Sequence, residues 1–221
     1  MKDFIEGYFI EELKTRFLCN VKVNDEIFLC YVPISCKLSK LIELKNNNVL
    51  LVENNNLKSK TKISLLAIES EKEYIIINTF IINKIIKEYL HSIFNIFTVK
   101  SECLIDDYKS DFYIDEQKLI IETKTVLSND TILKFPNINS QRSIVQLRKL
   151  KKLINKGYKV EYIFISLTSN LNQFVLNKNT EYVCLLKQCI ELGMVFKIWK
   201  LSLNNSVFSL DTNPNIIFRY S

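Results

Sequence analysis

The chain has 221 residues, of which 48% are hydrophobic and 11% aromatic, so it can bury a core and wholesale disorder is excluded. With only three glycines and three prolines, collagen-like and proline-rich classes are excluded as well. The formal net charge of +6 permits a nucleic acid or an anionic membrane surface as partner but requires neither.

The six cysteines and the single histidine limit the metal and redox chemistry that the chain can carry. No two cysteines form a C-x-x-C pair, so a zinc site of the usual spacing is not expected. The first residues carry acids where a signal peptide has an apolar run, so we expect free thiols in a reducing cytoplasm. The most apolar stretch, 75–97, is interrupted by polar and charged residues, so no membrane span is expected. A Ser/His/Asp hydrolase would depend on His91, which lies among apolar residues.

Residues 1–78 alternate short apolar runs with polar links, a pattern typical of β-strands. The pair Asn24-Asp25 between two of these runs predicts a hairpin turn. The predicted strands cover residues 16–23, 26–32, 48–52, 61–69 and 73–78. Because these strands follow one another without a clear helix, we expect an OB-like β-barrel over residues 1–78.

Residues 79–221 differ because helical periodicity now alternates with strand patterns. Apolar residues at i, i+3 and i+4 spacing predict a helix over 82–93. Further helices are predicted over 141–156, before Gly157, and over 180–192, between Thr180 as N-cap and Gly193 as stop. The predicted strands cover residues 97–105, 110–114, 118–126, 159–167 and 194–203. This order predicts a mixed sheet with flanking helices, and with the barrel it predicts a two-part chain of the α+β or α/β class.

Three charged residues in the predicted hairpin 110–126 form a candidate catalytic group. Glu122 and Lys124 are two residues apart on one strand, so their side chains emerge on the same face. If the hairpin turns symmetrically about residues 116 and 117, Asp111 lies directly opposite Glu122. Two carboxylates so close repel each other unless a cation such as Mg²⁺ lies between them, and Lys124 beside them can orient a water. The alternative is a solvated strand face with an ordinary Glu–Lys ion pair.

The predicted helix 141–156 carries several cations and no acid, so it accounts for the positive charge surplus of the chain. On a helical projection, one arc holds the leucines and the opposite arc holds Arg142, Arg148, Lys149, Lys152 and Lys156. Such a helix packs by one face and offers a cationic stripe by the other. The stripe predicts salt-dependent, non-specific binding to a nucleic-acid backbone, or else an ordinary lysine-rich solvent face.

Segments along nearly the whole chain resemble the sugar fermentation stimulation protein A (SfsA) family of bacterial and archaeal proteins. They are Arg16-Phe17-Leu18, Val32-Pro33, residues 61–69, Ser110-Asp111-Phe112, Glu122-Thr123-Lys124-Thr125-Val126, and Phe135-Pro136-Asn137 with Ser140 and Arg142. The resemblance implies an OB-like N-terminal domain over residues 1–78 and a PD-(D/E)xK nuclease-like domain over residues 79–221. It further implies that Asp111 and Glu122 bind metal, that Lys124 is catalytic and that Arg142 helps to hold a phosphate.

The chain departs from the family pattern at three places, one of which is Leu167, where the family has a glutamine at the end of a strand. The NTGR-type turn of the family reads Ile34-Ser35-Cys36-Lys37 here, so only the positive charge at Lys37 is kept. In the basic helix the family's G-x-K-H positions read Ser143-Ile144-Val145-Gln146, so a lysine and a histidine expected near the site are absent. We therefore expect Asp111, Glu122 and Lys124 to be kept while the residues that support them are lost, so that activity is weak, altered in substrate, or lost.

The first functional hypothesis is a nuclease that depends on Mg²⁺ or Mn²⁺, with Asp111 and Glu122 as metal ligands and Lys124 assisting the attacking water. Nucleic acid is the expected partner, DNA rather than RNA, and a homodimer is left open. The candidate nucleic-acid-binding residues are Arg16, Lys37, Arg142, Arg148, Lys149 and Lys152.

Two other hypotheses come from the same residues. A non-catalytic DNA-binding regulatory protein would bind through the barrel, with Phe17, Phe28 and Tyr31 as candidate stacking residues. A partner-binding protein that keeps only the fold would neither bind nor cleave nucleic acid.

For the nuclease hypothesis, Glu88 in the first predicted helix is a candidate for a further acidic metal ligand.

Overall fold

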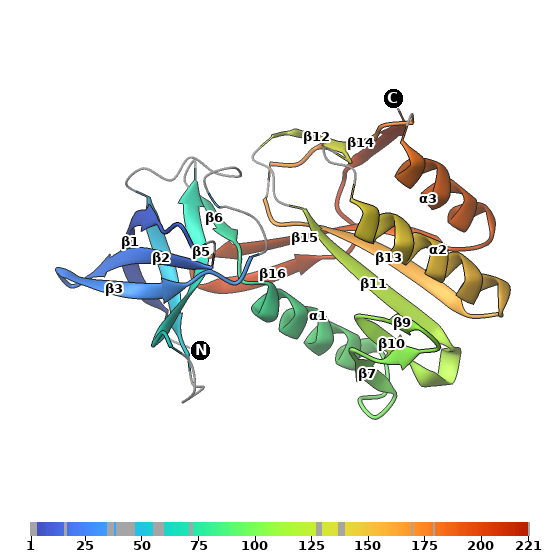
Figure 1. The fold of residues 1–221 in the computed structure, drawn as a ribbon, viewed down its shortest axis with the longest axis horizontal. Coiled ribbons are helices and arrows are strands. Elements are labelled where there is room, and N and C mark those ends of the chain that lie inside the picture. Colours follow the sequence, from blue (N-terminus) through green and yellow to red (C-terminus); the bar gives the residue numbers. More distant parts are fainter. Residues whose placement is uncertain are drawn as a thin grey trace.

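The structure is a computed structural model with two parts, a barrel and a larger sheet covered by helices (Figure 1). The described residues are 4–15, 17–34, 38, 47–54, 60–70, 73–126, 130–136, 140–168, 170–178 and 180–220. Two candidate nucleic-acid-binding residues, Arg16 and Lys37, lie outside the described residues. The expected two-part chain is confirmed, with the barrel first and the helix-bearing sheet second.

The barrel consists of five strands that close on themselves. They are β1 (Ile5–Glu12), β2 (Leu18–Val23), β3 (Glu26–Tyr31), β4 (Asn48–Glu53) and β5 (Ile63–Ser70). The strands pair in the order β3-β2-β1-β4-β5, and the parallel pairing of Cys30 with Ile63 joins β3 to β5. Closure leaves no edge among these strands, which suits a small barrel with apolar residues inside.

One hairpin of the barrel follows the sequence prediction closely. Val23 pairs with Glu26 across the turn, and Asn24 and Asp25 have φ values of 47° and 68°. Positive φ at both central residues belongs to the type of turn that matches strand twist, and Asn and Asp tolerate it better than other side-chain-bearing residues.

The composition of the barrel differs from the prediction in two strands. Residues 5–12 were not predicted as a strand but form β1, which pairs with both β2 and β4. The predicted strand 73–78 is β6 (Glu73–Ile76), which pairs with β5 and then with the second sheet instead of closing the barrel. The sheet therefore continues through β6, and the predicted domain boundary at residue 78 stays a prediction.

The second part is built on a sheet with the order β6-β15-β13-β11-β10-β7. Its strands β11, β13 and β15 are parallel, whereas β10 and β7 are antiparallel to their neighbours. The bounds are β7 (Val99–Ser101), β10 (Phe112–Ile114), β11 (Leu119–Val126), β13 (Lys159–Ser166) and β15 (Val195–Asn204). The helices are α1 (Thr79–Ile93), α2 (Gln141–Asn155) and α3 (Glu181–Glu191), and together with the five strands just given they follow the predicted order α-β-β-β-α-β-α-β.

The second part also contains short strands that were not predicted, of which only β16 (Val207–Asp211) joins the main sheet, by pairing with β15. Residues 97–105 were expected to form one strand, but the chain turns at Glu102, where φ is 53°, and so gives β7 and β8. The other additional strands are β8 (Leu104–Ile105), β9 (Tyr108–Lys109), β12 (Ile132–Phe135), β14 (Gln173–Leu176) and β17 (Ile217–Tyr220). β8 and β9 form a small hairpin, and β12, β14 and β17 form a separate parallel sheet.

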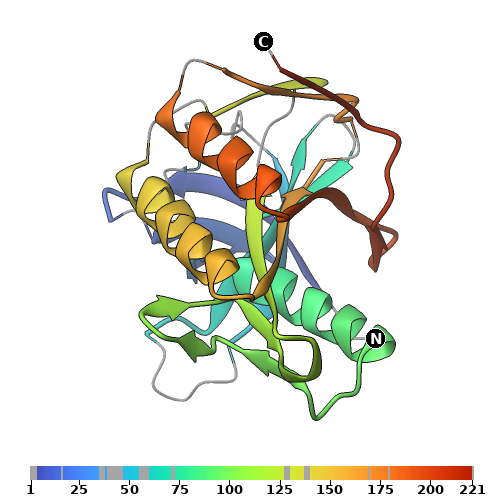
Figure 2. The same cartoon turned by 90° about the vertical axis from the view of Figure 1, so that its right-hand side faces the viewer.

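The two faces of the main sheet pack against different partners, as Figure 2 shows with α1 on one side and α2 and α3 on the other. Ile163 and Ile165 of β13 belong to a core that also contains the barrel interior and α1. Tyr162 and Phe164 of the same strand belong to a second core under α2 and α3. Alternate residues of a strand point to opposite faces, so the run from Tyr162 to Ile165 is apolar without interruption because both faces of β13 are covered there.

The ends of the helices confirm the predicted signals. The side chain of Thr180 accepts a hydrogen bond from the backbone N–H of Val183, which caps α3. Gly157 and Gly193 follow α2 and α3 with φ values of 88° and 102°, a conformation that glycine adopts without steric cost. These ends set where β13 and β15 begin.

We expect Phe164→Ala to lower the free energy of unfolding by about 3–5 kcal/mol, because the substitution leaves a cavity in a packed aromatic core. The Phe164 side chain is fully buried, with ring centroids 4.8 Å from Phe135 and 5.0 Å from Phe174. The matched control is Phe97→Ala, at an 88% exposed phenylalanine, with an expected change within about 0.5 kcal/mol. Urea denaturation measures both, and equal losses would contradict the assigned core.

Candidate active site

The β10–β11 hairpin brings the predicted catalytic residues together. Phe112 pairs with Ile121 and Ile114 with Leu119, which is the predicted alignment. Asp111 directly precedes Phe112, and Glu122 directly follows Ile121, so the two acids lie at the same level of the hairpin. Oδ2 of Asp111 accepts hydrogen bonds from the backbone N–H and the hydroxyl of Thr123, both at 2.7 Å. These bonds hold the Asp111 carboxylate against β11.

Glu122 is the most deeply placed acid of the site, with only 2% of its surface exposed. Its Oε1 accepts a hydrogen bond from Lys124 Nζ at 2.5 Å and another from Gln146 Nε2 at 3.3 Å. Its Oε2 accepts a hydrogen bond from the Tyr108 hydroxyl. Burial raises the pKa of the Glu122 carboxyl, the charge of Lys124 opposes this shift, and the nearby Asp111 adds to it. The three donors therefore stabilise a carboxylate whose charge is costly to bury.

Lys124 is held between this carboxylate and helix α2. Its Nζ donates to Gln146 Oε1 at 2.9 Å as well as to Glu122, and it lies 5.9 Å from the ring centroid of Tyr162. Its side chain stays 23% exposed, so the ammonium can still reach solvent. The predicted pairing of Glu122 and Lys124 on one face is thus present, but the pair is largely enclosed rather than a solvated strand face.

Gln146 is a site residue that the sequence analysis treated as a lost contact. It occupies one of the positions where the family pattern has other residues, yet its amide bonds both Lys124 and Glu122. The signal was present in the sequence, because Gln146 is a polar residue one position before Leu147 on the buried arc of the helix. Gln146 therefore contacts both Lys124 and Glu122 although it differs from the family pattern, and the expected loss of support stays a prediction.

Tyr108 is a second site residue that the sequence analysis missed. It lies in β9 and is 2% exposed, and burial together with the charge of Glu122 raises the pKa of its hydroxyl far above the ordinary value. The hydroxyl therefore remains protonated and donates to Glu122. The strands of the β8–β9 hairpin have only two residues each, so the sequence contains no periodic pattern from which they could be predicted.

A pocket of about 540 Å³ opens beside these residues. Tyr108 and Asp111 line it from the β9–β10 side, and Arg142, Gln146 and Lys149 line it from α2. Glu102, Asp107 and Lys109 line it as well, so its walls combine acids with cations, and Arg142 and Lys149 of the helix are groups that can hold an anion next to a carboxylate.

The cationic stripe of α2 is more fully paired than the sequence predicted. Arg148 pairs with Glu181 of α3 at 2.5 Å, Lys149 with Asp107 at 3.1 Å, and Lys156 with Asp106 at 2.6 Å. These cations hold α3 and the β8–β9 hairpin against α2, which a projection of one helix could not show. Among the described residues, Arg142 and Lys152 form no ion pair.

The other candidates lie away from the pocket or pack in the core. Phe28 packs against the barrel core, and Phe17 and Tyr31 stack on each other with centroids 6.5 Å apart. Glu88 pairs with Lys84 at 3.7 Å and lines a different pocket, between α1 and the barrel. Glu88 is therefore not brought to Asp111 and Glu122.

The donor set of Asp111 and Glu122 fits a hard divalent cation. Among the described residues, no group of three or more His, Cys, Asp or Glu side chains could hold a metal ion. Mg²⁺ does not need such a group, because it keeps several waters and binds through one or two carboxylates and substrate phosphates. Within the described part of the chain, Asp111 Oδ1 accepts no hydrogen bond and Glu122 Oε2 accepts only that of Tyr108. Each acid thus keeps lone pairs for a cation.

The architecture defines a class of protein, a closed barrel joined to a mixed sheet that carries an Asp, Glu and Lys group. The same fold is found in a solved structure titled "The structure of Pyrococcus Furiosus SfsA in complex with Ca2+". The TM-score is 0.80 at 18% sequence identity, over 99% of this chain and 96% of that chain. The profile described as "Sugar fermentation stimulation protein RE domain" matches residues 76–206. The chain belongs to the SfsA family.

Relatives by sequence agree with this assignment. A sugar fermentation stimulation protein homolog of Clostridium beijerinckii is 28% identical over 200 residues, covering 87% of this chain and 88% of its own length. A homolog from Thermosipho melanesiensis is 28% identical over 220 residues, covering 96% of this chain and 94% of its own length.

In the described part of the chain, none of the helices has the length and apolar character needed to cross a bilayer.

We expect Tyr108→Phe to lower the free energy of unfolding in metal-free buffer by about 1.5–3 kcal/mol, because the variant removes a hydrogen bond to a buried charge. The control is Tyr113→Phe on β10, whose hydroxyl forms no hydrogen bond with a described residue and whose loss should cost less than about 0.5 kcal/mol. Urea denaturation of both variants with EDTA present measures the difference. A loss in Tyr108→Phe no larger than in the control would mean that the hydroxyl does not stabilise Glu122.

Proposed function

We propose that this protein is a metal-dependent nuclease that hydrolyses phosphodiester bonds in nucleic acid. The observation that carries the proposal is the convergence of Asp111, Glu122 and Lys124 beside a pocket whose opposite wall carries Arg142 and Lys149. Carboxylates next to an ammonium, facing a basic wall, are the groups that phosphodiester hydrolysis requires. One structure with the same fold is titled as a complex with Ca²⁺, which supports a divalent cation as a ligand of this chain.

Each side chain of the site has its own role in the proposed reaction. Asp111 and Glu122 would hold the cation, which when bound would act as a Lewis acid on a phosphate oxygen. Lys124 would orient the attacking water or neutralise charge that develops on the phosphoryl group. Gln146 and Glu122 position the Lys124 ammonium by hydrogen bonds at 2.9 Å and 2.5 Å. Tyr108 holds the other oxygen of Glu122 and so fixes the orientation of that carboxylate.

The substrate would be bound through its phosphates. Arg142 lies at the pocket and has no ion pair with a described residue, and Lys152 extends the same helix face. Contacts of this kind are independent of base sequence and predict a salt-sensitive affinity. DNA is the proposed substrate.

The proposed location is the cytoplasm. The five cysteines among the described residues are all free, as is usual in a reducing compartment.

We expect Lys124→Ala to abolish metal-dependent cleavage while binding of nucleic acid is retained, because the lysine acts on the reacting atoms and not on the flanking backbone. The assay uses labelled single- and double-stranded DNA and RNA with Mg²⁺, Mn²⁺ or EDTA. The matched control is Lys159→Ala, at an exposed lysine that begins β13 at the opposite end of its pairing with β11. The control variant should cleave like the wild type.

Cleavage that persists in Lys124→Ala, or that is unchanged in EDTA, would overturn the proposed function. Absence of cleavage in the wild type, with salt-sensitive retention of the probe, would favour the alternative of a non-catalytic DNA-binding protein. One observation favours this alternative, since the Lys124 ammonium is already bonded to Glu122 and Gln146.

We expect Arg142→Ala to weaken binding of duplex DNA in EDTA and to reduce the slope of log K against log[salt] by about 1, because one phosphate contact is lost. The control is Lys151→Ala on the same helix, whose ammonium donates to Gln188 of α3 at 2.8 Å and faces away from the pocket. Fluorescence anisotropy at several salt concentrations measures both slopes. An unchanged slope in Arg142→Ala would remove this arginine from the binding surface.

A further inference from the structure

A row of polar and aromatic residues crosses the outer face of the barrel, away from the candidate active site. Tyr8 of β1 pairs with Lys22 on one side and with Asn48 on the other. The Asn48 side chain donates a hydrogen bond to Glu69 of β5, and Glu69 pairs with Tyr74 of β6. Cross-strand neighbours on one face lie in contact distance, so the row is continuous over five strands.

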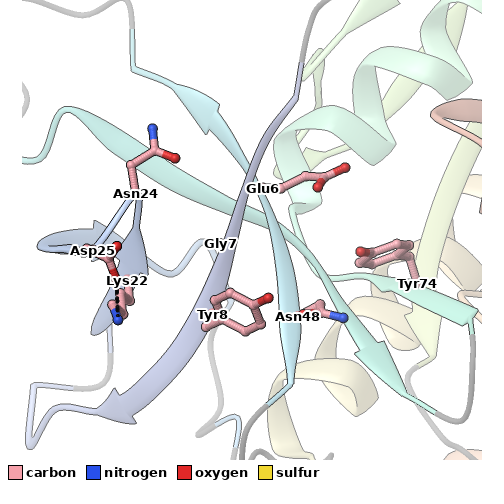
Figure 3. Close-up of a pocket in the computed structure, with 8 residues that line it drawn as sticks. All are labelled: Glu6, Gly7, Tyr8, Lys22, Asn24, Asp25, Asn48 and Tyr74. Carbon is pink, nitrogen blue, oxygen red and sulfur yellow. Dashed lines mark ion pairs between the residues drawn. The ribbon is translucent and has the colours of Figure 1, made fainter.

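A pocket of about 450 Å³ lies on this row. Figure 3 shows the Tyr8 and Tyr74 side chains on opposite sides of Asn48, with the Glu6 carboxylate directed to the side where Tyr74 lies. Glu6 is two residues before Tyr8 on β1, so both side chains emerge on the same outer face. The pocket therefore has aromatic walls, an amide between them and a carboxylate at its edge.

The acids in and beside this pocket outnumber its cations, since Glu6 and Asp25 line it, Glu69 lies beside it on β5, and Lys22 is the one cation among the described lining residues. Lys22 is paired with Asp25 at 2.7 Å, which leaves the carboxylates of Glu6 and Glu69 without a positive partner among the described residues. The Tyr8 and Tyr74 hydroxyls likewise form no hydrogen bond with a described residue. Burial raises the pKa of Tyr74, and the charges of Glu69 and Glu6 add to this shift, as expected for acids close to its hydroxyl. A local negative charge on a chain of net charge +6 disfavours phosphate here.

We propose that this pocket binds the primary ammonium group of an aliphatic amine of the polyamine class. An ammonium has three N–H donors and no acceptor, so it complements a carboxylate and phenol oxygens that lack donors. Its charge is also attracted to the faces of aromatic rings, and its methylene chain can pack against them. The site is separate from the proposed nuclease site and does not depend on it.

Isothermal titration calorimetry of spermidine into the full chain tests the proposal. We expect saturable binding by the wild type and a loss of affinity of about tenfold or more in Glu6→Gln, because a hydrogen bond to a charged group is removed. Tyr74→Leu, which removes an aromatic wall, should weaken binding as well. Glu26→Gln is the matched control, since this exposed acid lies on β3 outside the pocket and changes the net charge equally. It should leave the affinity within about twofold.

Three outcomes would overturn the proposal. They are the absence of saturable binding by the wild type, an equal loss in Glu26→Gln and Glu6→Gln, and displacement of spermidine by Mg²⁺ at equal ionic strength. Equal losses would mean general attraction to the negative surface, and displacement would mean a metal site. Circular dichroism checks that Glu6→Gln is folded, and Tyr74→Leu tests the same pocket without changing its charge. Nuclease activity should be the same in all three variants.

Discussion

The buried charge of Glu122 is the constraint on which the arrangement of the second part of the chain depends. A carboxylate that is 2% exposed is tolerated only if its oxygens are satisfied, because an unpaired buried charge costs several kcal/mol. The donors come from three separate elements, since Tyr108 lies in β9, Lys124 in β11 and Gln146 in α2. Glu122, a proposed metal ligand, therefore fixes three elements relative to one another: the β8–β9 hairpin, the central sheet and helix α2.

The distribution of charge gives the two parts of the chain different surfaces. On α2, Lys149 and Lys156 hold the β8–β9 hairpin through Asp107 and Asp106, and Arg142 stays at the pocket without an ion pair among the described residues. The outer face of the barrel instead carries acids between two tyrosines. Phosphate binding is therefore expected at the helix rather than at this barrel face, and the barrel face suits a cation.

The features that depend on local sequence were predictable, whereas those that depend on contacts between distant segments were not. The register that aligns Asp111 with Glu122 follows from the strand period of two and the symmetric turn, and the structure has it. Tyr108 was missed because two-residue strands have no period. The pairing of Arg148 with Glu181 joins residues of two helices, which no projection of one helix can reveal. Gln146 was judged only by its difference from the family pattern.

The central claim is that Glu122 forms part of a metal site that Tyr108, Lys124 and Gln146 hold in place. The most direct measurement is a calorimetric titration of Mn²⁺ into the wild type and the Glu122→Gln variant without nucleic acid, so that binding is observed apart from cleavage. We expect one saturable site in the wild type and an affinity weakened about tenfold or more in Glu122→Gln, because a ligand carboxylate is lost. Equal binding of Mn²⁺ by both proteins would contradict the claim.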